Sequence, residues 1–116
     1  MVRHDDGMDV EIREKMRGAP GQVTIKHLFK KDELEGKCRL MAKLTLEPGH
    51  GIGFHEHHDE EEVFYILKGS GTCDDGETQY PVVAGDALLT HSGQGHSLTN
   101  TGDETMELMA VILLHA

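Results

Sequence analysis

Basic residues, cysteines and long apolar runs are all scarce in this chain of 116 residues, and each shortage excludes a class of protein. Lys and Arg number 11 against 21 Asp and Glu, which gives a formal net charge of −10 with no basic patch. Such a surface would repel a phosphate backbone, so nucleic acid is excluded as a partner. No apolar run approaches the roughly 20 residues that cross a bilayer, so we expect no membrane association. The opening "MVRHDDGMDVEIREK" lacks the apolar core of a signal peptide, and we expect a cytoplasmic protein.

The two cysteines, Cys38 and Cys73, lie 35 residues apart and make no C-x-x-C pair. In a chain without a secretion signal, such residues are usually free thiols and seldom form a disulfide. Neither has a histidine close by in the sequence, which favours structural thiols over a catalytic cysteine.

The length fits one domain, residues 1–116, with a single core. Short segments rich in Val, Ile, Leu and Phe alternate with Gly- and Asp-containing turns about every ten residues, which predicts an all-β sandwich or barrel. Residues 9–17 fit either a helix or a lead-in strand. The segments predicted as strands are 22–29, 37–47, 62–69, 86–90 and 105–115.

The last of these segments is apolar on both faces. One face carries Met106, Leu108, Ala110, Ile112 and Leu114, and the other carries Met109, Val111 and Leu113. Since an antiparallel strand with one wet face should alternate apolar with polar residues, both faces are expected to be covered. We predict that one face lies inside the barrel and that a second copy of the chain covers the other in a homodimer. Cover from residues 9–29 of the same chain, as in a monomeric sandwich, is the alternative.

Histidine and acidic side chains crowd the stretch "GHGIGFHEHHDEEEVFYILKG", residues 49–69. His55 and His57 are two apart, a spacing that places both on one face of a strand and not of a helix. Glu62 begins the next apolar strand, so a hairpin of the two strands would turn Glu62 back toward the histidines. Two imidazoles and a carboxylate suit Fe, Mn, Ni, Co or Zn. We place Asp59, Glu60 and Glu61 in a solvated turn, and expect His50, His58 and Glu56 at the surface or beside the ligands.

A second stretch, "GDALLTHSGQGHSLTN" at 85–100, places His96 on a strand after two glycine turns, with Asn100 four residues later. Together the two stretches resemble the cupin superfamily. Its first motif, G-x5-H-x-H-x3-4-E-x6-G, fits Gly49, His55, His57, Glu62 and Gly69. Its second, G-x5-P-x-G-x2-H-x3-N, fits Gly85, Gly93, His96 and Asn100, with His91 in place of the proline.

The resemblance implies a double-stranded β-helix, or jelly-roll, barrel with a metal held by His55, His57, Glu62 and His96. It also implies a dimer, since members commonly exchange or pack terminal strands. More narrowly, the sequence is similar to small cupins described as oxalate-decarboxylase-like or mannose-6-phosphate-isomerase-like. Full oxalate decarboxylases carry a substrate-binding arginine shortly before the histidine pair, where this sequence has Ile52, and this departure argues against decarboxylation.

Three neutral imidazoles and one carboxylate would leave a net charge of about +1 on a divalent metal, with open positions for water, oxygen or a bidentate anion. We therefore expect one divalent transition metal per chain (Mn, Fe, Ni, Co or Zn) and a small anion as ligand. The leading hypothesis is an enzyme, a decarboxylase, dioxygenase or isomerase, acting on a dicarboxylate, keto acid or enolisable carbonyl compound. The alternative is a non-enzymatic module that binds a sugar or carboxylate.

Two further expectations concern the surroundings of the metal. Counting by twos, Phe64 and Ile66 share the face of Glu62, and Leu98 shares that of His96, which predicts a mainly apolar interior. The polar face of 37–47, which begins at Arg39, is expected to face solvent; turned inward, it could bind an acidic substrate. His91 and His58 are candidate catalytic proton carriers, because an unperturbed histidine titrates near neutrality.

Overall fold

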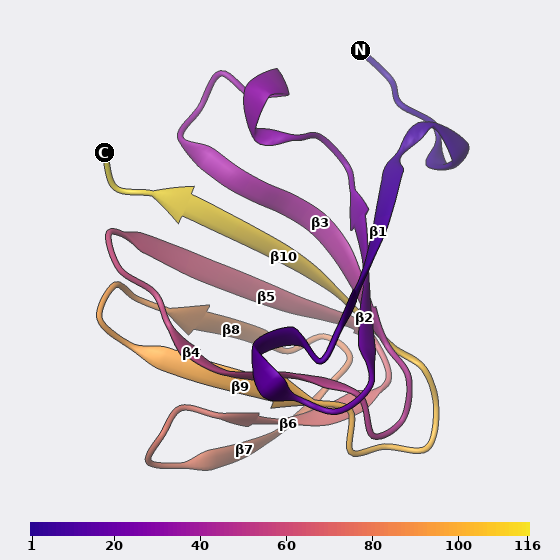
Figure 1. Ribbon diagram of the computed structural model, residues 1–116, viewed down its shortest axis with the longest axis vertical. Coiled ribbons are helices and arrows are strands. Elements are labelled where there is room, and N and C mark those ends of the chain that lie inside the picture. The colour runs from indigo at the N-terminus through magenta and orange to yellow at the C-terminus, as the bar shows by residue number, and fades with distance from the viewer.

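Two antiparallel sheets face each other and form a barrel in the computed structural model, which describes residues 1–116 (Figure 1). The six-stranded sheet has the order β1-β2-β3-β10-β5-β8, and the four-stranded sheet has the order β4-β9-β6-β7. None of the helices is long and apolar enough to span a membrane. The strands are β1 Asp9–Glu14, β2 Gln22–His27, β3 Cys38–Leu46, β4 Gly51–Glu56, β5 Glu60–Lys68, β6 Ser70–Asp74, β7 Gln79–Val83, β8 Ala87–Thr90, β9 Gly95–Thr99 and β10 Met106–Leu114.

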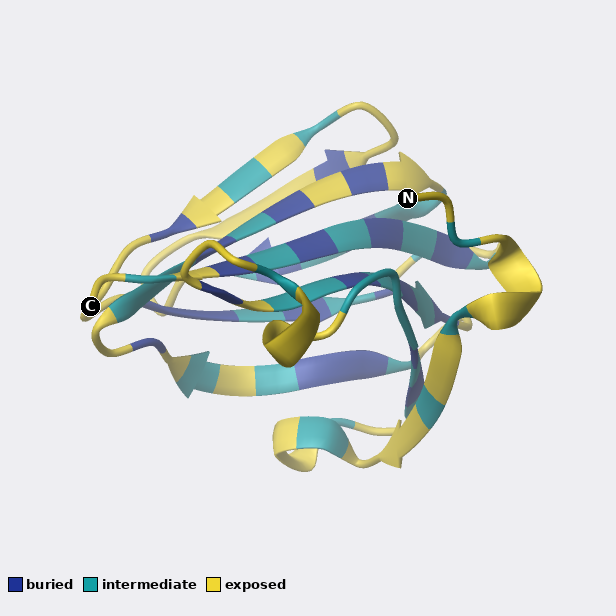
Figure 2. Ribbon diagram, turned by 90° about the horizontal axis from the view of Figure 1, so that it is seen from above, coloured by how far each residue is buried: buried dark blue, intermediate teal, exposed yellow.

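The core lies between the sheets and is built by alternation along the strands. Buried and more exposed residues follow one another along the longer strands, as Figure 2 shows, because successive side chains of a strand point to opposite faces. The inward set includes Ile66, Leu98 and Phe64, each at most 2% exposed, which confirms the inward direction predicted for these three side chains. On β3 the residues with even numbers point inward, so Met41, Lys43 and Thr45 point outward as expected. Arg39 departs from this expectation: it lies at the register shift between β3 and β10, and its side chain reaches Glu60.

The five predicted strand segments are confirmed with small shifts of their ends. For residues 9–17, where the sequence allowed a helix or a strand, the structure has strand β1, followed by a short 3-10 turn, η2, at Met16–Gly18. Residues 70–84, for which no strand was predicted, form the hairpin of β6 and β7. Cys38 and Cys73 are free and buried, as expected, and burial raises the pKa of the Cys73 thiol to about 11.

Strand β10 occupies the middle of the six-stranded sheet, between β3 and β5. Its inward residues, from Met106 to Ile112, are at most 4% exposed, which confirms that this face lies inside the barrel. On the outward face Leu113 is 40% exposed. Strands β1 and β2 continue the sheet sideways beyond β3, so the alternative in which residues 9–29 are stacked over β10 is not the arrangement of this sheet.

The histidine strand and the Glu62 strand do not form the hairpin that would turn Glu62 back toward the histidines. Strand β4 pairs with β9 in the four-stranded sheet, whereas β5 pairs with β10 and β8 in the six-stranded sheet. The turn between them, where Asp59 has a φ of 59°, carries the chain from one sheet to the other. Glu62 therefore faces the histidines across the barrel interior.

Candidate metal centre

Four predicted ligand residues meet inside the barrel from three strands. His55 lies on β4 directly opposite His96 on β9, His57 follows the end of β4, and Glu62 reaches in from β5. One ligand atom from each residue lies within 4.8 Å of the others. His57, His96 and Glu62 are 2–4% exposed, while His55 is half-buried. Three of the four residues are thus buried, and the cluster is more open on the side of His55.

A β-bulge aims His55 at this cluster. The register of β4 against β9 shifts between Ile52 and His55, so that Gly53 and Phe54 together oppose the single residue Ser97. Ile52 is buried at 3% exposed and Phe54 is 49% exposed. The extra residue turns Phe54 outward and allows both Ile52 and His55 to face the interior, although they are three positions apart.

Each histidine is fixed through its Nδ1 atom. His55 Nδ1 lies 2.8 Å from the Gly53 carbonyl oxygen, and His57 Nδ1 lies 2.6 Å from a carboxylate oxygen of Glu60. Both partners accept hydrogen bonds only, so Nδ1 carries the proton and Nε2 is left with a free lone pair. His96 Nδ1 lies 2.8 Å from the Thr90 hydroxyl, which can accept a hydrogen bond and so permits the same tautomer.

The free Nε2 lone pairs converge on one point. His57 Nε2 and His96 Nε2 are 3.1 Å apart, and each lies 3.0 Å from Glu62 Oε1. Lone pairs and a carboxylate at this separation repel one another unless a proton or a metal cation lies among them. Burial, the largest cause, lowers the pKa of His55 and so favours the neutral form that binds metals. The donor set therefore fits a divalent transition metal.

Glu60 and Arg39 support the cluster in a way that the sequence did not reveal. The Arg39 guanidinium donates two hydrogen bonds of 2.7 Å to the Glu60 carboxylate, which also holds His57. These Arg39 bonds, and after them the His57 contact, lower the pKa of Glu60 to about 2. The Glu60 side chain is 12% exposed, so its predicted place in a solvated turn is wrong.

The cluster opens into a small chamber of about 90 Å³. This volume holds several waters or a small ion, and it is well below the 300–1,000 Å³ typical of drug-sized ligands. Phe64 stacks on the His96 ring, with 5.0 Å between ring centroids and 10° between the planes. The remaining apolar lining is Met16, Ile25, Leu40, Leu44, Ile52 and Ile112, and the charged lining apart from the cluster is Glu11, Arg13, Arg17 and Arg39.

The cupin domain model matches residues 42–112, which include all four residues of the cluster. This chain belongs to the cupin family. The cupin is 40% identical over 114 residues to the oxalate-binding protein of Thermotoga maritima, across 98% of this chain and 94% of that one. A crystal structure of a predicted oxalate decarboxylase from the same organism matches with a TM-score of 0.93 at 40% identity, over 98% and 99% of the two chains. A cupin 2 conserved barrel domain protein from Rhodopseudomonas palustris shares the fold, with a TM-score of 0.75 at 22% identity over 95% and 73%.

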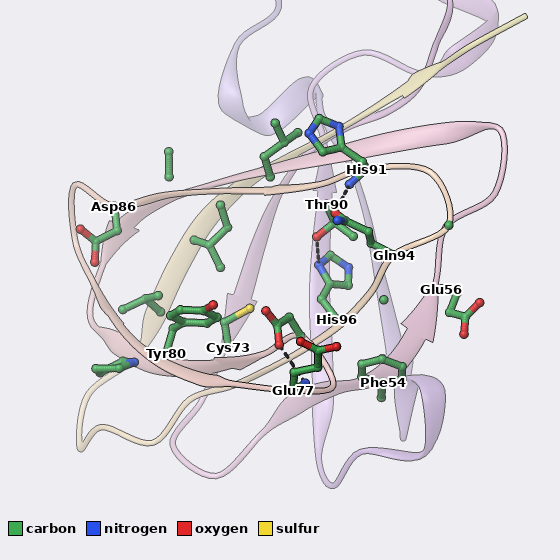
Figure 3. A pocket seen from close by; sticks show the side chains of 18 residues that line it. Phe54, Glu56, Cys73, Glu77, Tyr80, Asp86, Thr90, His91, Gln94 and His96 are labelled. Carbon is green, nitrogen blue, oxygen red and sulfur yellow. Dashed lines mark hydrogen bonds between the residues drawn. The ribbon is translucent and has the colours of Figure 1, made fainter.

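A second, wider cavity of about 900 Å³ lies on the other side of His96 in this cupin. Figure 3 shows His96 entering it beside Thr90, with Tyr80 and Phe54 along the wall. Its lining contains no Lys or Arg, and the acidic residues in it are Glu56, Asp75, Glu77 and Asp86. This charge disfavours anions, so the wide cavity and the small chamber suit different ligands.

The remaining predicted residues lie outside the chamber. His91 is 60% exposed at the edge of the wide cavity, 3.4 Å from Glu61, and His58 is 68% exposed, 3.2 Å from Glu56. The His91 backbone N–H donates to the Gln94 side chain at 3.0 Å, a bond that the proline of the family motif could not make. Neither ring lines the chamber.

Two residues of the motif region stabilise turns. His50 Nδ1 accepts a hydrogen bond of 3.1 Å from the Gln22 backbone. Asn100 is 1% exposed and donates to the carbonyl oxygens of Leu46 and Glu104, both at 2.8 Å. The His50 bond ties the turn before β4 to β2, and the Asn100 bonds tie the end of β9 to β3 and to the turn before β10. These contacts account for both residues without a role as metal ligands.

Proposed function

We propose that this cupin binds one divalent transition metal per chain through His55, His57, Glu62 and His96, and that the metal holds a small chelating anion of the oxalate type. The observation that carries the proposal is the convergence of two Nε2 atoms and one carboxylate oxygen within 3.0–3.1 Å. A bound metal would supply Lewis-acid charge for anionic oxygens. The relationship to an oxalate-binding protein supports this choice of ligand.

The chamber itself favours a small anion. Its volume of about 90 Å³ excludes large ligands, and its lining includes Arg13, Arg17 and Arg39. Apolar walls lower the local dielectric, so that an anion beside a cation gains more there than in water. The net charge of −10 opposes this at long range, but salt screens it beyond about 8–10 Å.

The protein's own groups hold the ligand set in a fixed arrangement. Gly53, Glu60 and Thr90 each fix one imidazole through Nδ1, which raises ligand basicity and orients the ring. Phe64 covers the His96 ring and excludes water from that side. Such a preformed site costs little reorganisation when the metal and anion bind.

The test combines elemental analysis with calorimetry. After incubation with metal and removal of the unbound ion, the protein should contain about one metal per chain. This metal-loaded protein should release heat on titration with oxalate or a 2-keto acid, whereas metal-free protein should give no heat with either anion. Neutral sugars serve as the comparison. Binding of sugars or phenolic compounds without any heat from oxalate and 2-keto acids would contradict the proposal.

Turnover of the anion is the second candidate function. Four protein ligands leave open positions on a six-coordinate metal, as catalytic sites do, and the matching Thermotoga structure is described as a predicted oxalate decarboxylase. Ile52, in place of the expected arginine, argues against decarboxylation. Product formation from a panel of small carboxylates and carbonyl compounds by metal-loaded protein would establish an enzyme; binding without any product would establish a binding module.

We also propose that a second copy of the chain covers the outward face of the six-stranded sheet. Met41, Val111, Val63 and Leu89 lie side by side across β3, β10, β5 and β8 and form one apolar row on that face. Val63→Glu should yield monomers in sedimentation, whereas Val83→Glu, on the opposite sheet, should not. A monomeric wild-type protein at micromolar concentration would contradict this proposal.

A further inference from the structure

One arginine at the metal chamber has no partner. Three of the four arginines form ion pairs: Arg3 with Glu33, Arg13 with Glu11 and Arg39 with Glu60. Arg17 lines the chamber together with His55, His57 and Glu62, and its guanidinium makes no hydrogen bond or ion pair within the chain. Five N–H donors and a full positive charge are therefore available beside the proposed metal site.

The fold holds Arg17 against the strand that carries the histidines. The turn η2 lies over β4 (Figure 1), and a Cβ atom added to Gly53 would lie only 1.9 Å from the Arg17 carbonyl oxygen. The Gly53 carbonyl oxygen in turn accepts the hydrogen bond from His55. The backbone of Arg17 thus packs directly against Gly53, the residue that orients the ring of a proposed ligand.

The backbone of this turn is held in an uncommon conformation. Lys15 and Arg17 have φ values of 50° and 55° without being glycines. Such left-handed residues cost on the order of 1 kcal/mol each, and they often occur where a side chain must be aimed. At Arg17 the conformation places a charged residue in the lining of the chamber.

The charges of the two cavities agree with this role. Of the three arginines that line the chamber, Arg13 is paired with Glu11 and Arg39 with Glu60, which lies outside the lining, so Arg17 remains as the unpaired positive charge. The wide cavity beyond His96 has four carboxylates and no cation. An anion that approaches the cluster is therefore attracted from the side of Arg17 and repelled from the other side.

We propose that Arg17 binds the outer oxygens of a chelating dicarboxylate and so determines the preference for two carboxylates over one. This inference rests on the proposed function. A guanidinium fork can donate one hydrogen bond to each of the two outer oxygens, one on each carboxylate, an arrangement that a lysine cannot reproduce. Where full oxalate decarboxylases carry an arginine before the histidine pair, this chain has Ile52, which is apolar and buried. The positive charge beside the metal site comes instead from Arg17 in the N-terminal segment.

Calorimetry with oxalate and acetate on metal-loaded variants tests the inference. Arg17→Gln should weaken oxalate binding by at least about tenfold and acetate binding by less than twofold, because the metal alone would hold the single carboxylate of acetate. Arg17→Lys should give an intermediate loss for oxalate. Lys15→Gln is the control and should bind oxalate like the wild-type protein, since Lys15 shares the left-handed backbone of this turn but does not line the chamber. Metal content should be unchanged in all variants.

Arg17→Gly separates the side chain from the backbone, because glycine adopts a positive φ without strain. It should lose oxalate affinity to the same extent as Arg17→Gln. Wild-type oxalate affinity in either of these variants, or loss of metal from Arg17→Gln, would overturn the role of Arg17. If the wild-type protein binds metal but no oxalate, the proposed function fails instead, so the two failures are distinguishable.

Discussion

Replacing Glu60 with glutamine should weaken metal binding without changing any of the four proposed ligands. In the native structure the Glu60 carboxylate lies 2.6 Å from His57 Nδ1 and accepts two bonds of 2.7 Å from Arg39. The amide of glutamine is neutral and offers a single acceptor oxygen, and its NH₂ group faces the donors of Arg39. His57 then loses its charged partner and part of its orientation.

The size of the effect follows from the kind of contact. Removing a hydrogen-bond partner of a metal-bound histidine typically lowers metal affinity by about 10–100-fold, or about 1.4–2.8 kcal/mol. Glu61→Gln is the matched control: Glu61 is the next residue on the same strand, and its carboxylate faces His91 and His115 outside the chamber. This variant should bind metal within twofold of the wild-type protein.

Competition against a chromophoric chelator with Zn²⁺ or Co²⁺ measures both affinities. Thermal unfolding of the metal-free variants checks that each one folds. Equal metal affinity in Glu60→Gln and Glu61→Gln would refute the reasoning, because the hydrogen bond from His57 to Glu60 would then contribute nothing to the site.

Three further predictions follow from burial and charge. The unfolding free energy of metal-free protein should decrease as the pH is lowered from about 4.5 to about 2. The reason is that folding lowers the pKa of Glu60 from 4.5 to about 2, so the unfolded chain binds more protons in this range. In a pH series of denaturant titrations, Glu60→Gln should reduce this dependence on pH. The Cys73 thiol, buried with a pKa of about 11, should react with a thiol reagent at pH 7 only after unfolding, and rapid reaction of native protein would contradict its burial. Phe64→Ala should cost about 3–5 kcal/mol of unfolding free energy, measured in denaturant, because it removes a side chain that is 2% exposed; a cost below 1 kcal/mol would contradict the packing.

The sequence predicted those features that depend on local spacing. The interval of two between His55 and His57, and the motif that adds Glu62 and His96, identified the four residues that the fold brings together. Alternation likewise predicted the inward set of β10, because side-chain direction in a strand has a period of two residues.

Features that depend on distant partners could not be predicted in this way. Local alternation does not encode which strands pair, so the sequence is compatible with a hairpin of β4 and β5 although the two strands belong to different sheets. Glu60 lies in a run of acidic residues typical of a solvated turn, and only the fold shows Arg39 beside it. The positive φ of Arg17 has no glycine to signal it.

Metal content of the purified protein, reconstituted with Zn²⁺ or Mn²⁺ and then freed of unbound ion, tests the central claim most directly. The wild-type protein should hold one metal per chain, and His57→Ala should hold none, because it removes an Nε2 atom that lies 3.0 Å from Glu62. His58→Ala, which changes the neighbouring and exposed histidine, should hold one metal like the wild-type protein. Full metal content in His57→Ala, or none in the wild-type protein, would contradict the assignment of the metal centre.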